Sequence, residues 1–178
     1  GHDALASRLA LIDEAQSSVD AQYYIWHDDT SGMLLLEALD RAAKRGVRVR
    51  LLLDDNGVSG LDGFMAALNR HENFQIRLFN PSTIRSPKMA GYAIDFMRMN
   101  RRMHNKSMIV DGAAAIIGGR NIGNEYFQIG EAFYVDMDAL AIGSIVPRTM
   151  EVFDQYWNAA SVFEIENIIP GEGDRAGF

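Results

Sequence analysis

Two strand-like segments, separated by one helix length of chain, constrain the fold more than any other feature of the sequence. Residues 47–53 read VRVRLLL and residues 18–26 read SVDAQYYIW. Runs this short and this rich in β-branched, aromatic and apolar residues are typical of buried β-strands. The intervening residues 33–45 have a helical pattern that ends at Gly46, and glycine is favoured just beyond a helix. The order strand, helix, strand predicts a crossover connection between parallel neighbours in one sheet.

The remaining segments extend this unit into an α/β architecture. We expect further helices over residues 4–17, 61–70 and 145–159, and strands over 75–79 and 133–143. Residues 106–119 predict a hairpin that turns at Asp111 and Gly112. Residues 92–100 are compatible with a helix. The predicted fold class is a mixed sheet flanked by helices, in one domain over residues 1–163, with residues 164–178 as a tail or the start of a linker.

Charge and composition exclude several functional classes. The chain has 17 Lys and Arg against 24 Asp and Glu, a net charge of −7, which argues against a surface that binds nucleic acid over its whole area. It contains no Cys, which excludes disulfide scaffolds, thiolate metal sites and cysteine nucleophiles. No apolar run reaches the roughly 18 residues of a membrane-spanning helix. The start lacks a signal-peptide pattern and an initiator Met, so we expect a processed product or a piece of a longer protein.

The residues that suggest chemistry gather in one stretch. His104 is followed by Lys106, then by Asp111 and by the sequence GGRN at 118–121. Residues i and i+2 of a strand point to one face, so we expect the His104 and Lys106 side chains to lie side by side. The hairpin should return Asn121 towards them. An imidazole, a cation and an amide donor at one point suit a phosphoryl group. A single histidine is more often structural, but this ordered combination is rare by chance.

This stretch resembles the signature of the phospholipase D superfamily, HxKxxxxDxxxxxxGSxN. Residues 104–121, HNKSMIVDGAAAIIGGRN, reproduce its spacing, with Gly119 in place of Ser. Gly119 lacks the serine hydroxyl that helps to hold phosphate. Either its backbone amide binds the phosphate instead, or phosphate is bound more weakly. The segments DAQYYIWHDDTSG, RGVRVRLLLDD, GGRNIGNEYF and FDQYWN extend the resemblance over nearly all of residues 1–163. The chain is most similar there to the amino-terminal half of bacterial cardiolipin-synthase-like proteins.

The resemblance implies transfer of a phosphatidyl group through a phosphohistidine, with no metal and no other cofactor. Two such motifs meet across a pseudo-twofold axis. One histidine attacks phosphorus, and the other protonates the leaving alkoxide and then deprotonates an acceptor alcohol. Carried over to this chain, the resemblance makes His104 the nucleophile, Lys106 and Asn121 a phosphate clamp, and Asp111 a local orienting residue.

The resemblance also implies a carboxylate or amide on a following strand that orients a histidine. Asp138 is the first candidate and Asp136 the second, because they share one face of the predicted strand. Other candidates for contact with phosphate or substrate lie within or near the motif: Gly119, Arg102, Glu125 and Tyr126.

One complete site needs two HxK motifs, and this chain has one. The other histidines, His2, His27 and His71, have Ala4, Asp29 and Asn73 at the position of the lysine. The second motif would come from a longer chain, which we favour, or from a homodimer partner. The expected substrates are a phospholipid and an alcohol acceptor at a membrane surface, on the cytoplasmic side of a bacterial inner membrane, and not nucleic acid. The alternatives are a phosphodiesterase or nuclease of the same superfamily, and a half-domain that binds phosphate or anionic lipid without turnover.

Three further patterns each have a structural and a functional interpretation. Six basic residues and one acid lie within residues 85–106, which suits an anionic substrate or a solvated loop. Methionines and aromatic residues from Met89 to Met103 suit a lipid contact, although core packing is the more common use. The clusters Asp54–Asn56 and His27–Asp29 suggest a metal, but Asx-rich turns are favoured.

Overall fold

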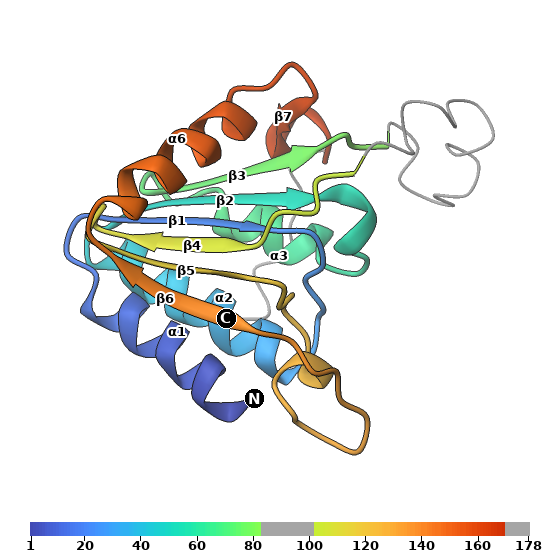
Figure 1. The fold of residues 1–178 in the computed structure, drawn as a ribbon. Coiled ribbons are helices and arrows are strands. Elements are labelled where there is room, and N and C mark those ends of the chain that lie inside the picture. The colour runs from blue at the N-terminus through green and yellow to red at the C-terminus, as the bar shows by residue number, and fades with distance from the viewer. Residues whose placement is uncertain (83–101, 170–178) are drawn as a thin grey trace.

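The computed structural model describes residues 1–82 and 102–169, which form a mixed sheet with the strand order β6-β5-β4-β1-β2-β3-β7 (Figure 1). The three parallel strands are β1 (Ser18–Tyr23), β2 (Arg48–Asp54) and β3 (Phe74–Phe79). The strands antiparallel to their neighbours are β4 (Ser107–Val110), β5 (Ala114–Gly118), β6 (Asp138–Ile142) and β7 (Val162–Glu164). The predicted mixed α/β sheet is therefore confirmed.

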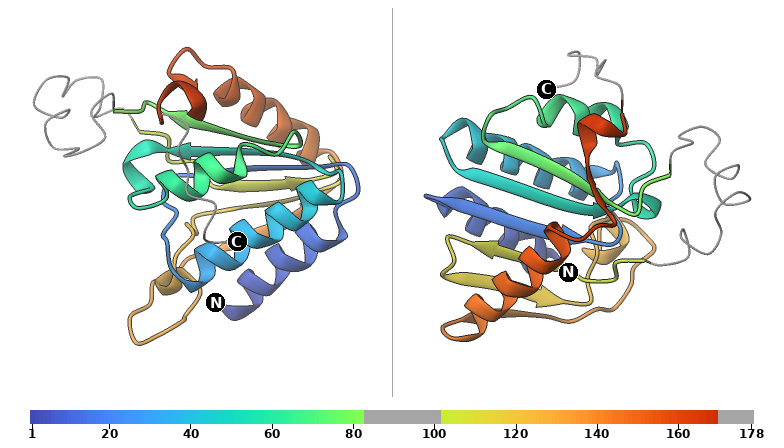
Figure 2. Two further views of the ribbon diagram at one scale, coloured as in Figure 1. Left: turned by 180° about the vertical axis from the view of Figure 1, so that it is seen from behind. Right: turned by 90° about the horizontal axis from the view of Figure 1, so that it is seen from above.

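Helices cover both faces of the sheet. One face carries α1 (His2–Glu14), α2 (Thr30–Lys44) and α3 (Asp62–Leu68), and the other carries α6 (Ile145–Trp157) (Figures 1 and 2). Because successive strand residues point to opposite faces, the apolar side chains form two layers. Leu51 packs in the larger layer under α1 to α3, whereas Leu52 packs with Phe153 of α6.

The predicted crossover is the connection from β1 through α2 to the parallel strand β2. Asp29 caps α2, because its side chain accepts a hydrogen bond from the Gly32 amide at 3.1 Å, which satisfies an otherwise unpaired donor of the first turn. Gly46 has a φ of 94° just past the helix, a left-handed conformation that glycine adopts without strain. Local capping at both ends thus sets the length of this helix.

The predicted strand over 133–143 begins only at Asp138. The residues before it bond to partners outside the ladder, since the Asp136 carbonyl accepts from the Arg120 guanidinium and the Tyr134 amide donates to the Glu125 carbonyl. At the other end, β7 pairs with β3 and Ile165 is buried. Ordered packing therefore continues past residue 163, where we expected the domain to end. The possible helix over 92–100 lies outside the described residues.

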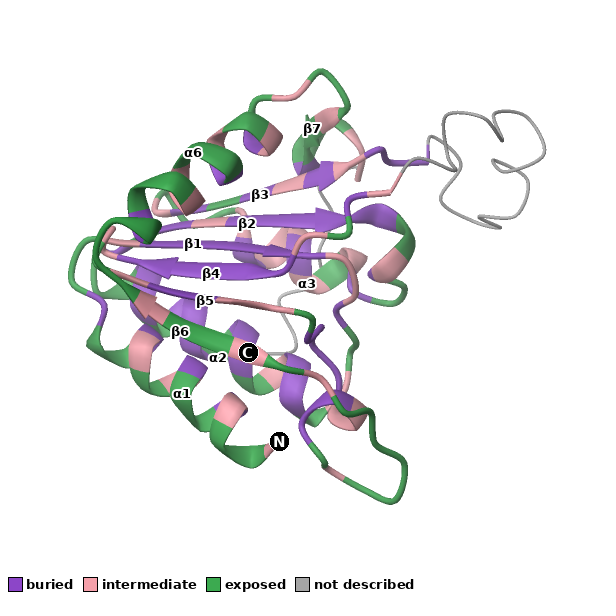
Figure 3. Cartoon of the chain, viewed as in Figure 1, coloured by how far each residue is buried: buried purple, intermediate pink, exposed green. Residues whose placement is uncertain are grey.

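Burial follows the order of the sheet, with β1, β2 and β4 enclosed and the edge strand β6 exposed (Figure 3). Met103 is fully buried in the layer beneath α6, so core packing is its role. None of the helices within residues 1–82 and 102–169 combines the length and hydropathy that crossing a membrane requires.

Asp111 occupies the tight turn between β4 and β5, with a φ of 54°. Its carboxylate accepts hydrogen bonds from the backbone amides of Gln16, Ser17 and Ser18 and from the Ser17 hydroxyl. These bonds hold the pKa of Asp111 at about 2, although partial burial acts in the opposite direction. The turn is the end of β4 opposite to His104. We expected Asp111 to orient residues of the site, and this expectation is wrong, because Asp111 lies away from His104. Its carboxylate instead binds the hairpin to the start of β1.

We expect Asp111→Asn to lower the free energy of unfolding at pH 7 by about 1 kcal/mol, after allowance for solvent screening. A depressed carboxyl pKa adds stability above the unfolded pKa of about 4, and this contribution disappears as the pH falls towards 2. Urea titrations from pH 7 to pH 2 measure the difference between variant and parent. Glu131→Gln, on an exposed loop, is the matched control. A difference that does not shrink at low pH contradicts the assignment.

Candidate functional site

His104 and Lys106 are in direct contact. The Lys106 Nζ lies 2.9 Å from Nδ1 of His104 and 2.8 Å from the His104 carbonyl oxygen. The imidazole is exposed, whereas Lys106 is buried. The predicted juxtaposition is therefore present, but not through strand alternation, because β4 begins only at Ser107. The lysine side chain instead folds back over the backbone of His104.

Sheet topology places this pair at the carboxyl ends of the parallel strands. β4 runs antiparallel to β1 with Ser107 opposite Gln22, so the residues just before β4 lie beside the end of β1. The ring of Tyr24, which follows β1, lies 5.0 Å from the His104 ring and 5.5 Å from the Lys106 Nζ. The carboxyl edge of parallel strands is the usual position of a ligand site in α/β folds.

A cavity of about 390 Å³ opens beside the pair. Its sheet side is formed by Gln22, His104, Lys106 and Ser107, and its other wall includes Ile145 and Arg148 of α6. The His104 ring thus lies on the wall of a space large enough for a small organic phosphate.

The electrostatics of Lys106 depend on burial and on one carboxylate. Burial lowers the pKa of Lys106, and the negative charge of Asp136 raises it in part. Asp138, our first candidate for a carboxylate at this site, is instead paired with Arg8 at 3.0 Å and Arg120 at 2.9 Å. Two guanidinium groups occupy the Asp138 carboxylate, so the prediction that Asp138 orients a histidine is wrong. Asp136, the second candidate, is the carboxylate whose negative charge raises the pKa of Lys106, and its role towards a histidine stays a prediction.

Two glycines allow the chain before β6 to approach this hairpin. A Cβ at Gly119 would lie 2.4 Å from Asp136 Oδ1, the mobile end of a side chain. A Cβ at Gly118 would lie 2.4 Å from the Met137 carbonyl oxygen and 2.7 Å from the Asp138 Cα, which are backbone atoms. Gly119 therefore provides the space that the Asp136 carboxylate fills.

Asn121 is buried beside the segment that follows β1. Its Oδ1 accepts from the Ile25 amide at 3.1 Å, and its Nδ2 donates to the Tyr126 hydroxyl at 3.2 Å. The amide nitrogen carries a second hydrogen that these two bonds do not use, although Asn121 is not among the residues that line the cavity beside His104. His104 packs on Tyr24 and Asn121 binds its neighbour Ile25, so both flank the same short segment. Burial raises the pKa of Tyr126.

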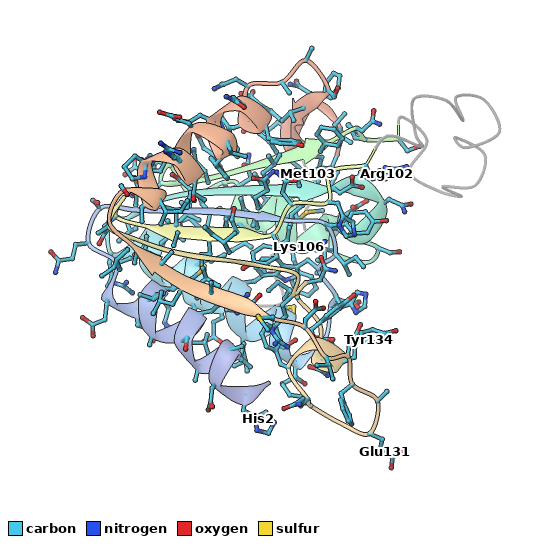
Figure 4. All side chains as sticks on the ribbon, viewed as in Figure 1. His2, Arg102, Met103, Lys106, Glu131 and Tyr134 are labelled. Atoms are coloured by element: carbon cyan, nitrogen blue, oxygen red, sulfur yellow. The ribbon has the colours of Figure 1, made fainter. Side chains whose placement is uncertain are left out.

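Arg102 and Glu125, two other predicted substrate contacts, face protein groups and do not line the cavity. Arg102 bonds to the fully buried Asp54 at 3.2 Å, and the Met103 amide bonds to the same carboxylate at 2.9 Å. Burial raises the pKa of Asp54, and these donors oppose the shift. The bonds tether the chain just before His104 to the end of β2. Figure 4 labels Arg102 and Met103 in this segment.

The two clusters that we considered as metal sites, Asp54–Asn56 and His27–Asp29, form a turn and a helix cap. Asp54 accepts from the Asn56 amide at 3.0 Å, an Asx turn. His27 and Glu125 approach to 3.2 Å, and Asp29 lies 4.0 Å from His27. These three side chains are close enough to share an ion. However, the Asp29 carboxylate already caps α2 and accepts the Asn124 amide at 2.6 Å, so protein donors explain its position.

Sequence reasoning missed three residues that define the site: Gln22, Tyr24 and Arg148. They come from β1, the segment after it, and α6, and none lies near the HxK motif in the chain. Only the pairing of β1 with β4 and the packing of α6 bring them to His104, so no spacing rule identifies them.

Comparison with known proteins identifies the family and the fold. Residues 9–157 match the family model described as cardiolipin synthase, PLD-like domain. The chain is 49% identical over 176 residues to cardiolipin synthase C of Escherichia coli, covering 98% of this chain and 37% of that protein. It is 31% identical to the major cardiolipin synthase ClsA of Bacillus subtilis, covering 96% and 34%. The structure of NucT from Helicobacter pylori superimposes with a TM-score of 0.66 at 17% identity, covering 91% of each chain, which is a likeness of fold.

The two adjacent glycines should respond differently to a side chain. We expect Gly118→Ala to lower the free energy of unfolding by about 3 kcal/mol, because backbone must move. Gly119→Ser should cost less than about 1 kcal/mol, because only the Asp136 carboxylate has to rotate. Thermal denaturation of both variants measures the contrast, with each glycine serving as the control for the other. Equal losses would contradict the close approach described above.

Proposed function

Because this chain belongs to the cardiolipin synthase, phospholipase D-like domain family, we propose that it supplies one catalytic half-site of a phosphatidyltransferase. We define the half-site as His104, Lys106 and Asn121. The observation that carries the proposal is the contact of Lys106 Nζ with the exposed His104 imidazole, 2.9 Å apart at the wall of a cavity. The substrates we propose are a phospholipid and an alcohol acceptor, presented at a membrane surface.

The reaction proceeds in two displacements at phosphorus. A ring nitrogen of His104 attacks the phosphorus of the phosphodiester, and a phosphorus–nitrogen bond forms as the bond to the leaving alkoxide breaks. The alkoxide takes a proton from a second histidine. That histidine then removes the proton of the acceptor hydroxyl, whose oxygen attacks phosphorus and releases His104. Lys106 and the remaining Asn121 hydrogen stabilise the charge on the non-bridging oxygens in both steps.

The proton-transferring histidine must come from outside this half-site. The chain spans about a third of the length of the curated relatives it matches, covering 37% and 34% of them. Beside the cavity, α6 leaves Ile145 and Val152 exposed at 44% and 43%. Apolar side chains exposed at the rim of a catalytic cavity suit a surface covered by another protein unit. We propose that this unit is the second HxK lobe, in a longer chain or in a second copy.

We expect His104→Ala to abolish exchange of the headgroup of short-chain phosphatidylglycerol, because the bond to phosphorus can no longer form. Mass spectrometry of the parent after an alkaline quench should show a phosphatidyl adduct on His104 that the variant lacks. His2→Ala, which changes the histidine at the start of α1 (Figure 4), should retain both signals. Cleavage of single-stranded DNA in place of lipid exchange would favour the nuclease alternative.

Turnover should depend on the presence of two motifs. We expect no exchange from chains that sediment at 19.8 kDa and exchange only from a species of twice that mass or from a longer two-motif protein. Sedimentation equilibrium gives the mass of the species in solution, and the exchange assay gives its rate of headgroup exchange. Both are measured over one concentration series. A monomer that turns over at full rate would contradict the half-site assignment. Phosphate binding without turnover in every assembly would favour the binding-module alternative.

A further inference from the structure

Gln22 has the one buried side-chain nitrogen or oxygen that finds no hydrogen-bond partner within residues 1–82 and 102–169. The residue is 1% exposed, and the unpartnered atom is Nε2, a donor of two hydrogens. Buried polar groups of native proteins are nearly always hydrogen-bonded, and an unsatisfied one is costly. A chain that retains such a group in the middle of its sheet therefore needs an explanation.

The position of Gln22 supplies that explanation. The residue lies on β1 opposite Ser107 of β4, and it lines the same cavity as His104 and Lys106. The cavity continues past it to Arg148 and Thr149 of α6. Gln22 and Ser107, opposite each other in the sheet, are thus the polar residues of β1 and β4 that lie further into the sheet than the histidine–lysine pair.

Another buried polar residue of β1 shows the contrast. Asp20, two positions before Gln22, is 2% exposed. Its carboxylate accepts from Arg50 at 2.7 and 2.8 Å. The strand therefore provides a protein partner for one buried polar side chain and none for the other. Only the side chain at the cavity is left unpaired.

We propose that Gln22 is a substrate-binding residue whose side-chain amide donates a hydrogen bond to an oxygen of the alcohol group esterified to the phosphate. The inference rests on the proposed function, because His104 and Lys106 hold the phosphate. A phosphate at that pair directs one of its alcohol substituents into the cavity, where Gln22 supplies the donor. The ligand class is a phosphodiester whose alcohol substituent offers an oxygen that accepts from the Gln22 amide.

The test is calorimetric titration of the 178-residue chain with two probes, inorganic phosphate and glycerophosphoglycerol, a soluble diester. Gln22→Leu removes the donor at similar volume, and we expect it to weaken diester binding about tenfold and phosphate binding less than twofold. Gln22→Glu places a negative charge in the cavity and should weaken diester binding further. Gln75→Leu, an exposed glutamine on β3, is the matched control and should bind as the parent does.

A stability measurement separates this role from a structural one. Because Nε2 has no partner to lose, Gln22→Leu should melt at the same temperature as the parent or higher. A lower melting temperature with unchanged diester affinity would overturn the proposal. So would equal weakening of both probes by Gln22→Leu, since the contact would then be to the phosphate.

The outcomes for Lys106→Ala distinguish failure of the proposed half-site from failure of the proposed role of Gln22. If Lys106→Ala loses both probes while Gln22→Leu binds the diester as the parent does, the role of Gln22 is refuted and the half-site stands. If the parent binds neither probe, the half-site and the role of Gln22 are both refuted.

Discussion

The antiparallel pairing of β4 with β1 is the constraint on which the site depends. Because the two strands run in opposite directions, the start of β4 lies at the carboxyl end of the parallel strands. His104 and Lys106 therefore reach the edge where loops can form a ligand site. The same pairing sets Ser107 opposite Gln22, so a residue more than 80 positions away in the chain shares the cavity wall. A parallel arrangement would send the HxK motif to the opposite edge.

Around this pairing, three carboxylates bind donors that hold the fold together, and a fourth raises the pKa of Lys106. Asp111 binds three backbone amides at the far end of β4, Asp54 tethers the chain before His104, and Asp138 pairs with two arginines. Each of these acids already has its hydrogen-bond donors within the protein. Asp136 is different, because its charge acts on Lys106 and its oxygen fills the space beside Gly119. The departure from Ser at position 119 is therefore coupled to the position of that carboxylate.

The features predicted correctly from sequence are those with a local physical cause. The crossover through α2 follows from periodicity and from the end of the helix at Gly46, and the hairpin follows from the turn at Asp111 and Gly112. The contact of His104 with Lys106 follows from their separation of two residues, although the lysine folds back and the expected strand alternation is absent. The errors arose where distant partners decide the outcome. The sequence places Asp138 where it could bind a histidine, but in the structure its carboxylate pairs with Arg8 and Arg120. The strand β7 is defined by its pairing with β3, which no local pattern predicts.

By itself, the sequence determined the family, the α/β class and the proximity of His104 to Lys106, because motif spacing and periodicity are properties of neighbouring residues. The tertiary structure alone decided which acid influences the pKa of Lys106, where the cavity lies and which other side chains line it. Those outcomes depend on strand order, on close approach at Gly118 and Gly119 and on the packing of α6. A buried donor without a partner, such as Gln22, is visible only when every other polar group around it has been placed.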